Sequence, residues 1–220
     1  LASSNWLTRQ GVGRPRPGYE LVGAQLAAAD RIIGFGSRGS VGTETALVVH
    51  TLTAAYSWDG TSFTAITGTW AASTATQHAR MVPYMSGGTL WLVRTNLANA
   101  LDKWDGTGSF VSPTGTAPRA MDVTVLAGHL LLFHVHDGTT EYPYRVQWND
   151  FNDIYVWTST NTAELDATPD EGIACRAIGP LSAALYKEDS VWLAVAQAAR
   201  APFQFQLIER MPGPISAAAL

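Results

Sequence analysis

Two histidines separated by one residue form the pattern in this sequence most typical of a metal site. His134 and His136 flank Val135, and His129 lies just upstream. Alternate residues of a strand point to the same face, so two imidazoles at this spacing could chelate zinc or copper. The same strand carries the apolar run 130–133, however, and no further ligand follows at a diagnostic spacing. We therefore expect ordinary hydrogen-bonded histidines, no metal and no cofactor.

Acidic side chains gather in one polar stretch, and a pair of carboxylates across a cleft would suit glycoside hydrolysis. The stretch contains Asp150, Asp153, Glu164, Asp166, Asp170 and Glu171. Its Asn, Thr and Pro residues are typical of a solvated loop. The chain has no Gly-x-Ser-x-Gly motif, and its one cysteine, Cys175, has apolar neighbours typical of a buried thiol. No nucleophile is indicated, and we expect a protein that is not an enzyme.

A glycine-rich stretch matches the dinucleotide-binding fingerprint. Gly34, Gly36 and Gly39 have the required spacing and follow an apolar strand. The fingerprint binds a pyrophosphate only when its last glycine opens a helix. Here the following residues lead into the β-rich run 45–49. The match therefore predicts a glycine-rich hairpin and no nucleotide site.

Composition excludes several classes of protein. The chain has 220 residues, is 46% hydrophobic and 15% charged, and carries a formal net charge of −4. This balance excludes a disordered chain. The mild acidity argues against a dedicated nucleic-acid binder. One cysteine excludes an internal disulfide framework, and no apolar run is long enough to span a membrane. The chain begins with Leu1, from which we expect a processed protein or a piece of a longer one.

Short runs of β-branched, leucine and aromatic residues, separated by glycine-containing turns, fill most of the chain. Asp59-Gly60, Asp105-Gly106 and Asp137-Gly138 are candidates for type I′ hairpin turns, because glycine accepts a positive φ and aspartate tolerates it. Helix signals are nearly absent. The sequence therefore predicts an all-β fold of antiparallel strands joined by hairpins.

A repeat of about 45 residues organises these strands. The stretch Trp58-Asp59-Gly60 with Phe63 recurs at Trp104-Asp105-Gly106 with Phe110, and a divergent copy surrounds Trp148. Each copy follows an apolar run, and each run follows a short strand that begins with an arginine. The fourth unit combines the strand at Arg176, the run Val191–Val195 and the strand at Phe203. In this alignment Trp192 corresponds to Trp91, so that its spacing from Trp148 is accidental.

Units of this length with three or four strands are typical of β-propeller blades. We expect about four blades, at 23–68, 69–115, 116–168 and 169–213, after an entry segment at 1–22 and before a tail or further blade at 214–220. They could form a small closed ring or part of a larger one. The aromatic residues expected to anchor the blades against one another, with a ligand platform as the alternative, are Trp58, Trp91, Trp104, Trp148, Trp157, Trp192 and Phe203.

Four arginines recur at the start of the first strand of each unit. They are Arg31, Arg80, Arg119 and Arg176. Equivalent positions of a propeller form a ring, so these side chains could line the channel or one rim. The alternative is that each caps a strand end or pairs with an acid of a neighbouring blade.

Three stretches resemble a family of tailed-phage virion proteins. The first is Asn5-Trp6-Leu7 with Gly11 and Arg16-Pro17-Gly18-Tyr19, and the second runs from Arg145 through Trp148-Asn149-Asp150 and Asp153 to Trp157. The third is Lys187-Glu188-Asp189-Ser190-Val191-Trp192, followed by Pro202-Phe203-Gln204-Phe205 and Pro212-Gly213. These stretches resemble the entry segment, a blade ending and the passage between blades of the tail nozzle (tail tubular protein B) of short-tailed phages and related head–tail connector propellers. Asn149 stands where serine is common in that family.

This resemblance implies a structural role in the virion. It implies a ring of identical subunits, six in number, at the tail or portal vertex, bound to an adaptor or tail protein. DNA would pass through the ring during ejection and would not be bound stably. Two other classes stay open: a receptor- or glycan-binding propeller of a fibre or decoration protein, and a glycosidase-type or metal-dependent propeller enzyme.

Overall fold

The computed structural model describes residues 6–9, 12–15, 31–39, 47–68, 78–113, 117–197, 202–210 and 213–214. These stretches contain strands and turns but no helix, which confirms the all-β class. Within them, therefore, no helix is long and apolar enough to cross a membrane. The Arg16–Tyr19 part of the entry motif and residues 215–220 lie outside the described residues.

The strands form four sheets and one separate hairpin. The hairpin pairs β1 (Trp6–Arg9) with β2 (Val12–Pro15). The first sheet contains β3 (Ile32–Ser37), β4 (Leu47–Thr51), β5 (Ala55–Trp58) and β6 (Phe63–Ile66). The second contains β7 (Arg80–Ser86), β8 (Thr89–Thr95) and β9 (Asp102–Trp104), the third β10 (Arg119–Leu126), β11 (His129–His136), β12 (Glu141–Trp148) and β13 (Thr162–Glu164). The fourth contains β14 (Gly172–Gly179), β15 (Ser182–Lys187), β16 (Val191–Ala196) and β17 (Phe203–Glu209).

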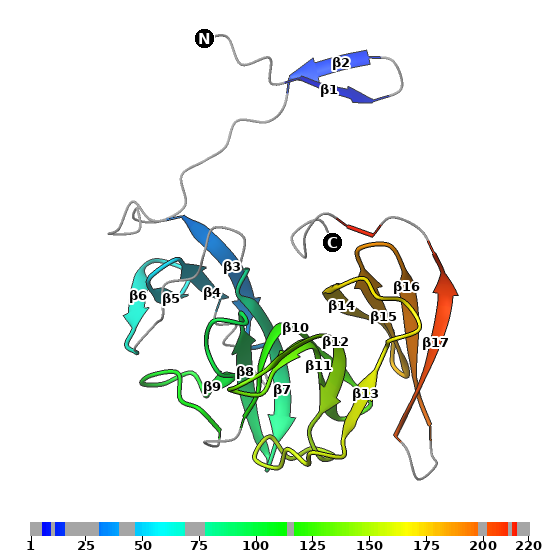
Figure 1. Ribbon diagram of the computed structural model, residues 1–220. Helices are drawn as coiled ribbons and strands as arrows, with labels where there is room; N and C mark the ends of the chain where they lie inside the picture. The colour runs from blue at the N-terminus through cyan, green and yellow to red at the C-terminus, as the bar shows by residue number, and fades with distance from the viewer. Residues whose placement is uncertain are drawn as a thin grey trace.

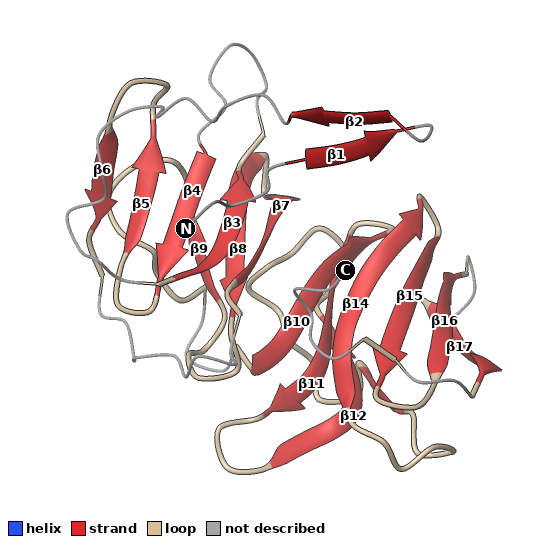
Figure 2. Ribbon diagram, turned by 90° about the horizontal axis from the view of Figure 1, so that it is seen from above, coloured by secondary structure: helices blue, strands red, loops and turns tan. Residues whose placement is uncertain are grey.

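Each sheet is an antiparallel meander in which strands pair in chain order. Each also lies within one of the four segments that the repeat defines. The first strands of the sheets are neighbours in space: β3 contacts β7, β7 contacts β10, and β10 contacts β14. The sheets therefore follow one another in a series, with the first and fourth at its two ends (Figures 1 and 2).

The hydrophobic core is divided among the contacts between successive sheets. One cluster joins the first and second sheets through Val48, Ala55 and Leu92. A second cluster lies between the second and third sheets, and the third lies between the third and fourth. This division explains a high apolar content in a chain of short strands, because each sheet buries its faces against its neighbours.

The glycines of the nucleotide-like fingerprint lie in β3, which has a packing role for them. A Cβ atom on Gly34 would lie 2.1 Å from the carbonyl oxygen of Ala79, and one on Gly36 would lie 2.5 Å from the Cβ of Met81. Both glycines therefore allow β3 and β7 to approach closely. As expected, this segment is a strand, and no helix follows it in the described residues 38 and 39.

We expect Gly34→Ala to destabilise the fold by about 3 kcal/mol, because the added methyl group overlaps backbone that cannot rotate away. Urea denaturation would measure the loss. Thr64→Ala, on the exposed side of the edge strand β6, is the control and should change stability by less than about 0.5 kcal/mol. Equal losses in the two variants would contradict the close-approach explanation.

The type I′ prediction for the Asp–Gly turns is wrong. Gly60, Gly106 and Gly138 have positive φ, but the aspartates before them do not. Instead, the Asp59 carboxylate accepts hydrogen bonds from the backbone N–H groups at 61 and 62, and Asp137 accepts the same bonds at 139 and 140. The two-residue turns with positive φ at both positions are Gly87-Gly88 and Ala127-Gly128.

The predicted alignment of the fourth unit is also wrong. The strand β15 intervenes, so Val191–Val195 lies in the third strand of its sheet and not in the second. Alanine is a poor strand former, which hid the Ala183-Ala184 segment. The corrected order places Trp192 in the third strand of its sheet, as Trp148 is in its own. Trp148 ends β12, however, whereas Trp192 lies near the start of β16, so the two positions are not equivalent and the spacing between them is accidental, as predicted.

One type of cross-strand pair recurs in the four sheets. In every sheet the tryptophan of the third strand lies directly opposite a leucine of the second strand. The pairs are Leu47–Trp58, Leu92–Trp104, Leu131–Trp148 and Leu185–Trp192.

Candidate functional site

The third sheet carries a buried carboxylate, Asp122 of β10, that joins three neighbouring first strands. It pairs with Arg176 of β14 and with Arg80 of β7, whose Nε lies 3.5 Å away. It also accepts the N–H groups of Cys175 and Val123, at 2.9 and 2.8 Å. Burial raises the pKa of Asp122, and the two arginines oppose this effect. One carboxylate thus connects the second, third and fourth sheets.

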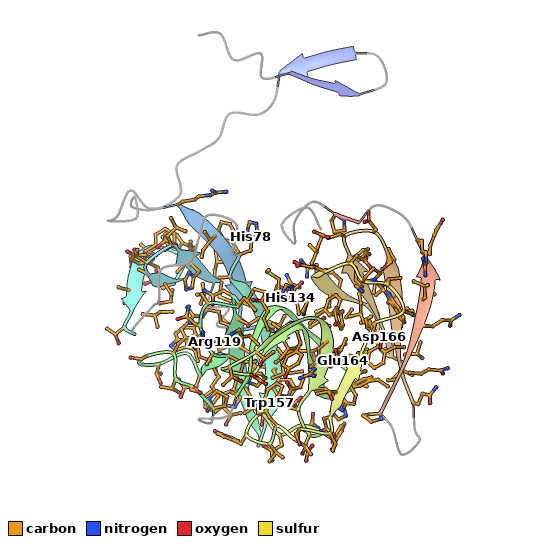
Figure 3. All side chains as sticks on the ribbon, in the orientation of Figure 1. His78, Arg119, His134, Trp157, Glu164 and Asp166 are labelled. Atoms are coloured by element: carbon orange, nitrogen blue, oxygen red, sulfur yellow. The ribbon has the colours of Figure 1, made fainter. Side chains whose placement is uncertain are left out.

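The four recurring arginines do not occupy equivalent positions. Arg80 and Arg119 begin their strands, and Arg31 immediately precedes β3. Arg176, in contrast, lies in the middle of β14. Arg80 and Arg176 converge on the same acid of a neighbouring sheet, as the packing alternative expects, and Arg119 is half-buried beside His136. Figure 3 labels Arg119 on the side of the third sheet that is next to the second.

A second buried ionic group connects the first and second sheets. Arg94 of β8 is 1% exposed and binds both carboxylate oxygens of Asp102 in β9. Its Nη1 lies 2.5 Å from Nε2 of His50, which is on β4 of the first sheet. Burial raises the pKa of Asp102 to about 6, although Arg94 counteracts it. This network connects the first and second sheets beside the apolar cluster that they share.

The stretch that resembles a blade ending folds back onto the second sheet. The Asn149 side chain accepts the N–H of Leu130 at 2.5 Å and donates to the hydroxyl of Tyr84 in β7 at 2.7 Å. The Ser86 hydroxyl accepts the N–H of Ile154 at 3.0 Å. The loop at 149–157 is therefore fastened to the second and third sheets at once, and Trp157 lies at its end (Figure 3).

Lys103 of β9, also in the second sheet, binds the same loop. It is 4% exposed, and its Nζ donates to the Tyr155 hydroxyl at 2.8 Å. The ammonium also lies over the ring of Trp91, 3.2 Å from its centroid. A cation over an indole ring is attracted by the electrons of the aromatic face. Trp91 therefore anchors a cation as well as packing against the core.

The third stretch of the resemblance surrounds a fully buried lysine. Lys187 is 0% exposed, and its Nζ donates to the carbonyl of Leu165 at 3.0 Å and to the carbonyl and hydroxyl of Thr168 at 2.5 and 2.9 Å. Asp170 completes the set at 3.3 Å. Burial lowers the pKa of Lys187, and Asp170 opposes this effect. Lys187 thereby ties the connection at 165–171 to the fourth sheet.

Trp192 and Ser190 of the same stretch bind the same connection. The indole N–H of Trp192 donates to the Thr168 hydroxyl at 3.3 Å, and the Ser190 hydroxyl donates to Asp170 at 2.8 Å. Residues 187–192 thus hold the passage between the third and fourth sheets in one conformation.

Asp170 should make the fold acid-sensitive. Burial alone would raise its pKa, but hydrogen bonds from Asp189, Thr168 and Ser190 together lower it to about 2. A lowered carboxyl pKa stabilises the fold above the unfolded-state value and loses that contribution as the pH falls through the folded-state value. We expect a loss of about 2 kcal/mol between about pH 5 and pH 2 from this group. Denaturation at several pH values would measure it. In Asp170→Asn this part of the pH dependence should disappear, and an unchanged slope would contradict the assignment.

The three histidines of the metal-like pattern do not converge. His134 lies at a bulge with φ of +56°, and its ring nitrogens contact the Gly172 carbonyl at 2.9 Å and the Glu141 carboxylate at 2.6 Å. His136 instead accepts a turn N–H, and His129 contacts the Asn149 carbonyl. In the part of the chain that the structure describes, no three metal-ligating side chains come together.

The clustered carboxylates mostly have structural partners. Glu164 pairs with Arg145 across β12 and β13, Asp150 accepts from Asn161, and Asp170 binds Lys187. Figure 3 shows Glu164 and Asp166 beside β13, at the outer side of the third sheet. The arrangement holds strands and loops, and no pair of these acids is placed across a described cleft.

The sequence matches no protein-family model and no curated protein. Its geometry therefore carries the functional argument.

The predicted aromatic anchors lie at the contacts between sheets, with one exception. Trp104 belongs to the cluster of the first and second sheets, and Trp91 and Trp157 pack against the cluster of the second and third. Trp148, Trp192 and Phe203 belong to the cluster of the third and fourth. The exception is Trp58, which is only half-buried in the first sheet. The sequence analysis did not predict that Asp122, Arg94 and Lys103 hold sheets together. For Asp122 and Arg94 the available signal was a charged residue within an apolar strand.

Proposed function

We propose that the four sheets are blades of a β-propeller and that the chain is a non-enzymatic structural protein of a phage virion. In this role it belongs to the tail or portal vertex, as a nozzle or head–tail connector that forms part of the genome conduit. The observation that carries the propeller is the series of four-stranded and three-stranded meanders whose first strands are successive neighbours. In a propeller, first strands surround the axis in this order.

The residues behind the phage resemblance support the structural part of the proposal. Asn149 and its loop connect the third sheet to the second, and Lys187 with Trp192 fixes the passage to the fourth. These motifs therefore serve the joints between blades. A protein whose distinctive residues hold neighbouring sheets together is better suited to a ring that bears mechanical load than to catalysis.

Charge is compatible with DNA in transit. The chain carries a net charge of −4 and has only two lysines, Lys103 and Lys187, both of which are buried. Tight DNA binding gains its free energy from cationic side chains that displace counterions from phosphates. With 18 acidic against 14 basic residues, the chain as a whole offers little of this driving force, which suits DNA that passes without being held. The proposed ring contains six copies and contacts an adaptor or tail protein.

Immunogold electron microscopy of phage particles that encode this chain would test the virion assignment. Antibodies against the purified chain should label the tail or portal vertex, at one end of each particle. Cryo-electron microscopy of that vertex would then count the blades per subunit and the subunits per ring. Labelling of fibres alone, or of no part of the particle, would contradict the proposal.

Exposed aromatic residues favour a second candidate, a receptor- or glycan-binding module. Phe151 and Tyr155, on the loop at 149–157, are 65% and 48% exposed. Aromatic rings that present an open face are typical sugar platforms. A glycan array probed with the wild-type chain and with Phe151→Ala would decide it, because this candidate requires binding that the substitution abolishes.

A further inference from the structure

Three turns of the chain have the same sequence, Asp-Gly-Thr, beginning at Asp59, Asp105 and Asp137. An aspartate followed by glycine is the pair most prone to isomerisation, because glycine has no side chain to restrict its backbone or to shield its nitrogen. The glycines of the three turns also share one backbone conformation, with φ of +98°, +103° and +104°. The same local chemistry therefore occurs three times, and the contacts of each aspartate side chain distinguish the turns.

Isomerisation begins when the glycine nitrogen attacks Cγ of the protonated aspartate side chain. A C–N bond forms and a molecule of water leaves, which gives a cyclic succinimide. Water then adds to either ring carbonyl. Addition at Cγ restores aspartate, whereas addition at the former backbone carbonyl breaks the original C–N bond and leaves isoaspartate, whose main chain runs through Cβ and is longer by a carbon atom. The reaction needs no partner besides water, but the carboxyl group must be free to reach the nitrogen.

The three aspartate side chains are held to different extents. Asp137 accepts four hydrogen bonds, three on Oδ1 from the two residues after the glycine and one on Oδ2 from Tyr142. Asp59 accepts three, two on Oδ1 and one on Oδ2. Asp105 accepts two, both from Thr107 and both on Oδ1, at 2.9 Å. Among the described residues, Oδ2 of Asp105 has no hydrogen-bond donor, so this carboxyl group is the easiest of the three to rotate.

Hydrogen bonding also controls how much of each side chain is in the reactive, protonated form. The N–H groups of Thr140 and Thr139 hold the pKa of Asp137 well below its usual value. At Asp105 burial raises the pKa and so opposes the hydrogen bonds from Thr107, which lower it. The protonated form is therefore suppressed most strongly at the turn that also holds its carboxyl group most firmly.

We infer that Asp105 is the residue at which this protein isomerises first as it ages, and that the change loosens the contact between the first and second sheets. Trp104 and Phe110 flank the turn, lie 6.0 Å apart between ring centroids and belong to the apolar cluster that the two sheets share. Arg38, which follows β3, covers the turn: a Cβ on Gly106 would lie 2.3 Å from its Nη1. A main chain that gains a carbon atom here displaces Arg38 or the two rings.

Storage of the purified protein at mildly acidic pH, followed by mass spectrometry that separates aspartyl from isoaspartyl peptides, would test the site. We expect isoaspartate to form at Asp105 about threefold faster than at Asp59 and about tenfold faster than at Asp137, because each hydrogen bond that must break slows the reaction about threefold. Synthetic peptides of the three turns give the rates without the fold and should react alike. Equal rates in the folded protein, or a faster reaction at Asp59 or Asp137, would overturn the inference.

Two sets of variants test the cause and the consequence. Thr139→Val with Tyr142→Phe removes two of the four hydrogen bonds of Asp137 and should bring its rate to that of Asp105. An unchanged rate at Asp137 would contradict protection by hydrogen bonds. Asp105→Ser cannot form the succinimide, since serine has no side-chain carbonyl carbon. Wild type should lose stability toward urea as isoaspartate accumulates, whereas aged Asp105→Ser should keep its initial stability. Isoaspartate at position 105 without a loss of stability would overturn the effect on the sheet contact.

Discussion

Replacing Asp122 by alanine is expected to lower the free energy of unfolding by about 3–5 kcal/mol. The carboxylate is 0% exposed and is the common partner of Arg80 and Arg176, on strands from two other sheets. Its removal leaves one guanidinium 18% exposed and the other 34% exposed without their counter-ion, and it leaves the Cys175 N–H without an acceptor. Chemical denaturation followed by tryptophan fluorescence would measure the loss.

Two variants separate the lost charge from the lost side chain. Asp122→Asn keeps the volume and one carbonyl acceptor, so it should lose less stability than the alanine variant. Asp189→Ala, at an exposed carboxylate, should change stability by less than about 0.5 kcal/mol. If Asp122→Ala were as stable as Asp189→Ala, the central acid would not be the joint that its contacts suggest.

Lys187→Met should be similarly damaging, with a loss of about 3–5 kcal/mol. Methionine fills the space of the lysine stem, but it cannot donate to the carbonyls of Leu165 and Thr168 or neutralise Asp170. Buried acceptors that lose their donor keep the full cost of leaving water. Thermal unfolding would measure the effect, and limited proteolysis should reveal cleavage in the connection at 165–171 before the rest of the chain.

Arg145→Met provides the comparison for Lys187. Arg145 pairs with Glu164, but the two side chains are 23% and 35% exposed. Ion pairs that water reaches contribute at most about 1 kcal/mol. A loss at Arg145 as large as that at Lys187 would show that burial is not what makes the lysine important.

The repeat made most of the fold predictable. Glycine-bounded apolar runs and the recurring tryptophans gave the strand class and the order of three units. The fourth unit was misaligned because Ala183 and Ala184 form a strand through their neighbours and not through their own propensity. The strand β15, which corrects the alignment, is recognised by its pairing with β14 and β16, and that pairing is not visible in the sequence.

The buried ionic groups were only partly predictable. The arginine series drew attention to Arg80 and Arg176, but their shared partner could not be identified because the contact joins residues of three different units. Asp122 between Met121 and Val123, an acid inside an apolar strand, was the available signal. For Lys187 the signal was the scarcity of lysine in the sequence. The chain has two lysines, both are buried, and each binds a segment that links two neighbouring sheets.

The division of the core among successive sheets sets the order in which the molecule opens. Among the described residues, the second and third sheets each share apolar clusters with two neighbours, whereas the first and fourth each share one. Stability in such a series is a sum of nearest-neighbour terms, so unfolding begins at the ends and moves inward. A partner that caps an end sheet removes the weakest point of the series. Capping of both end sheets would therefore make the four sheets unfold together, as one cooperative unit.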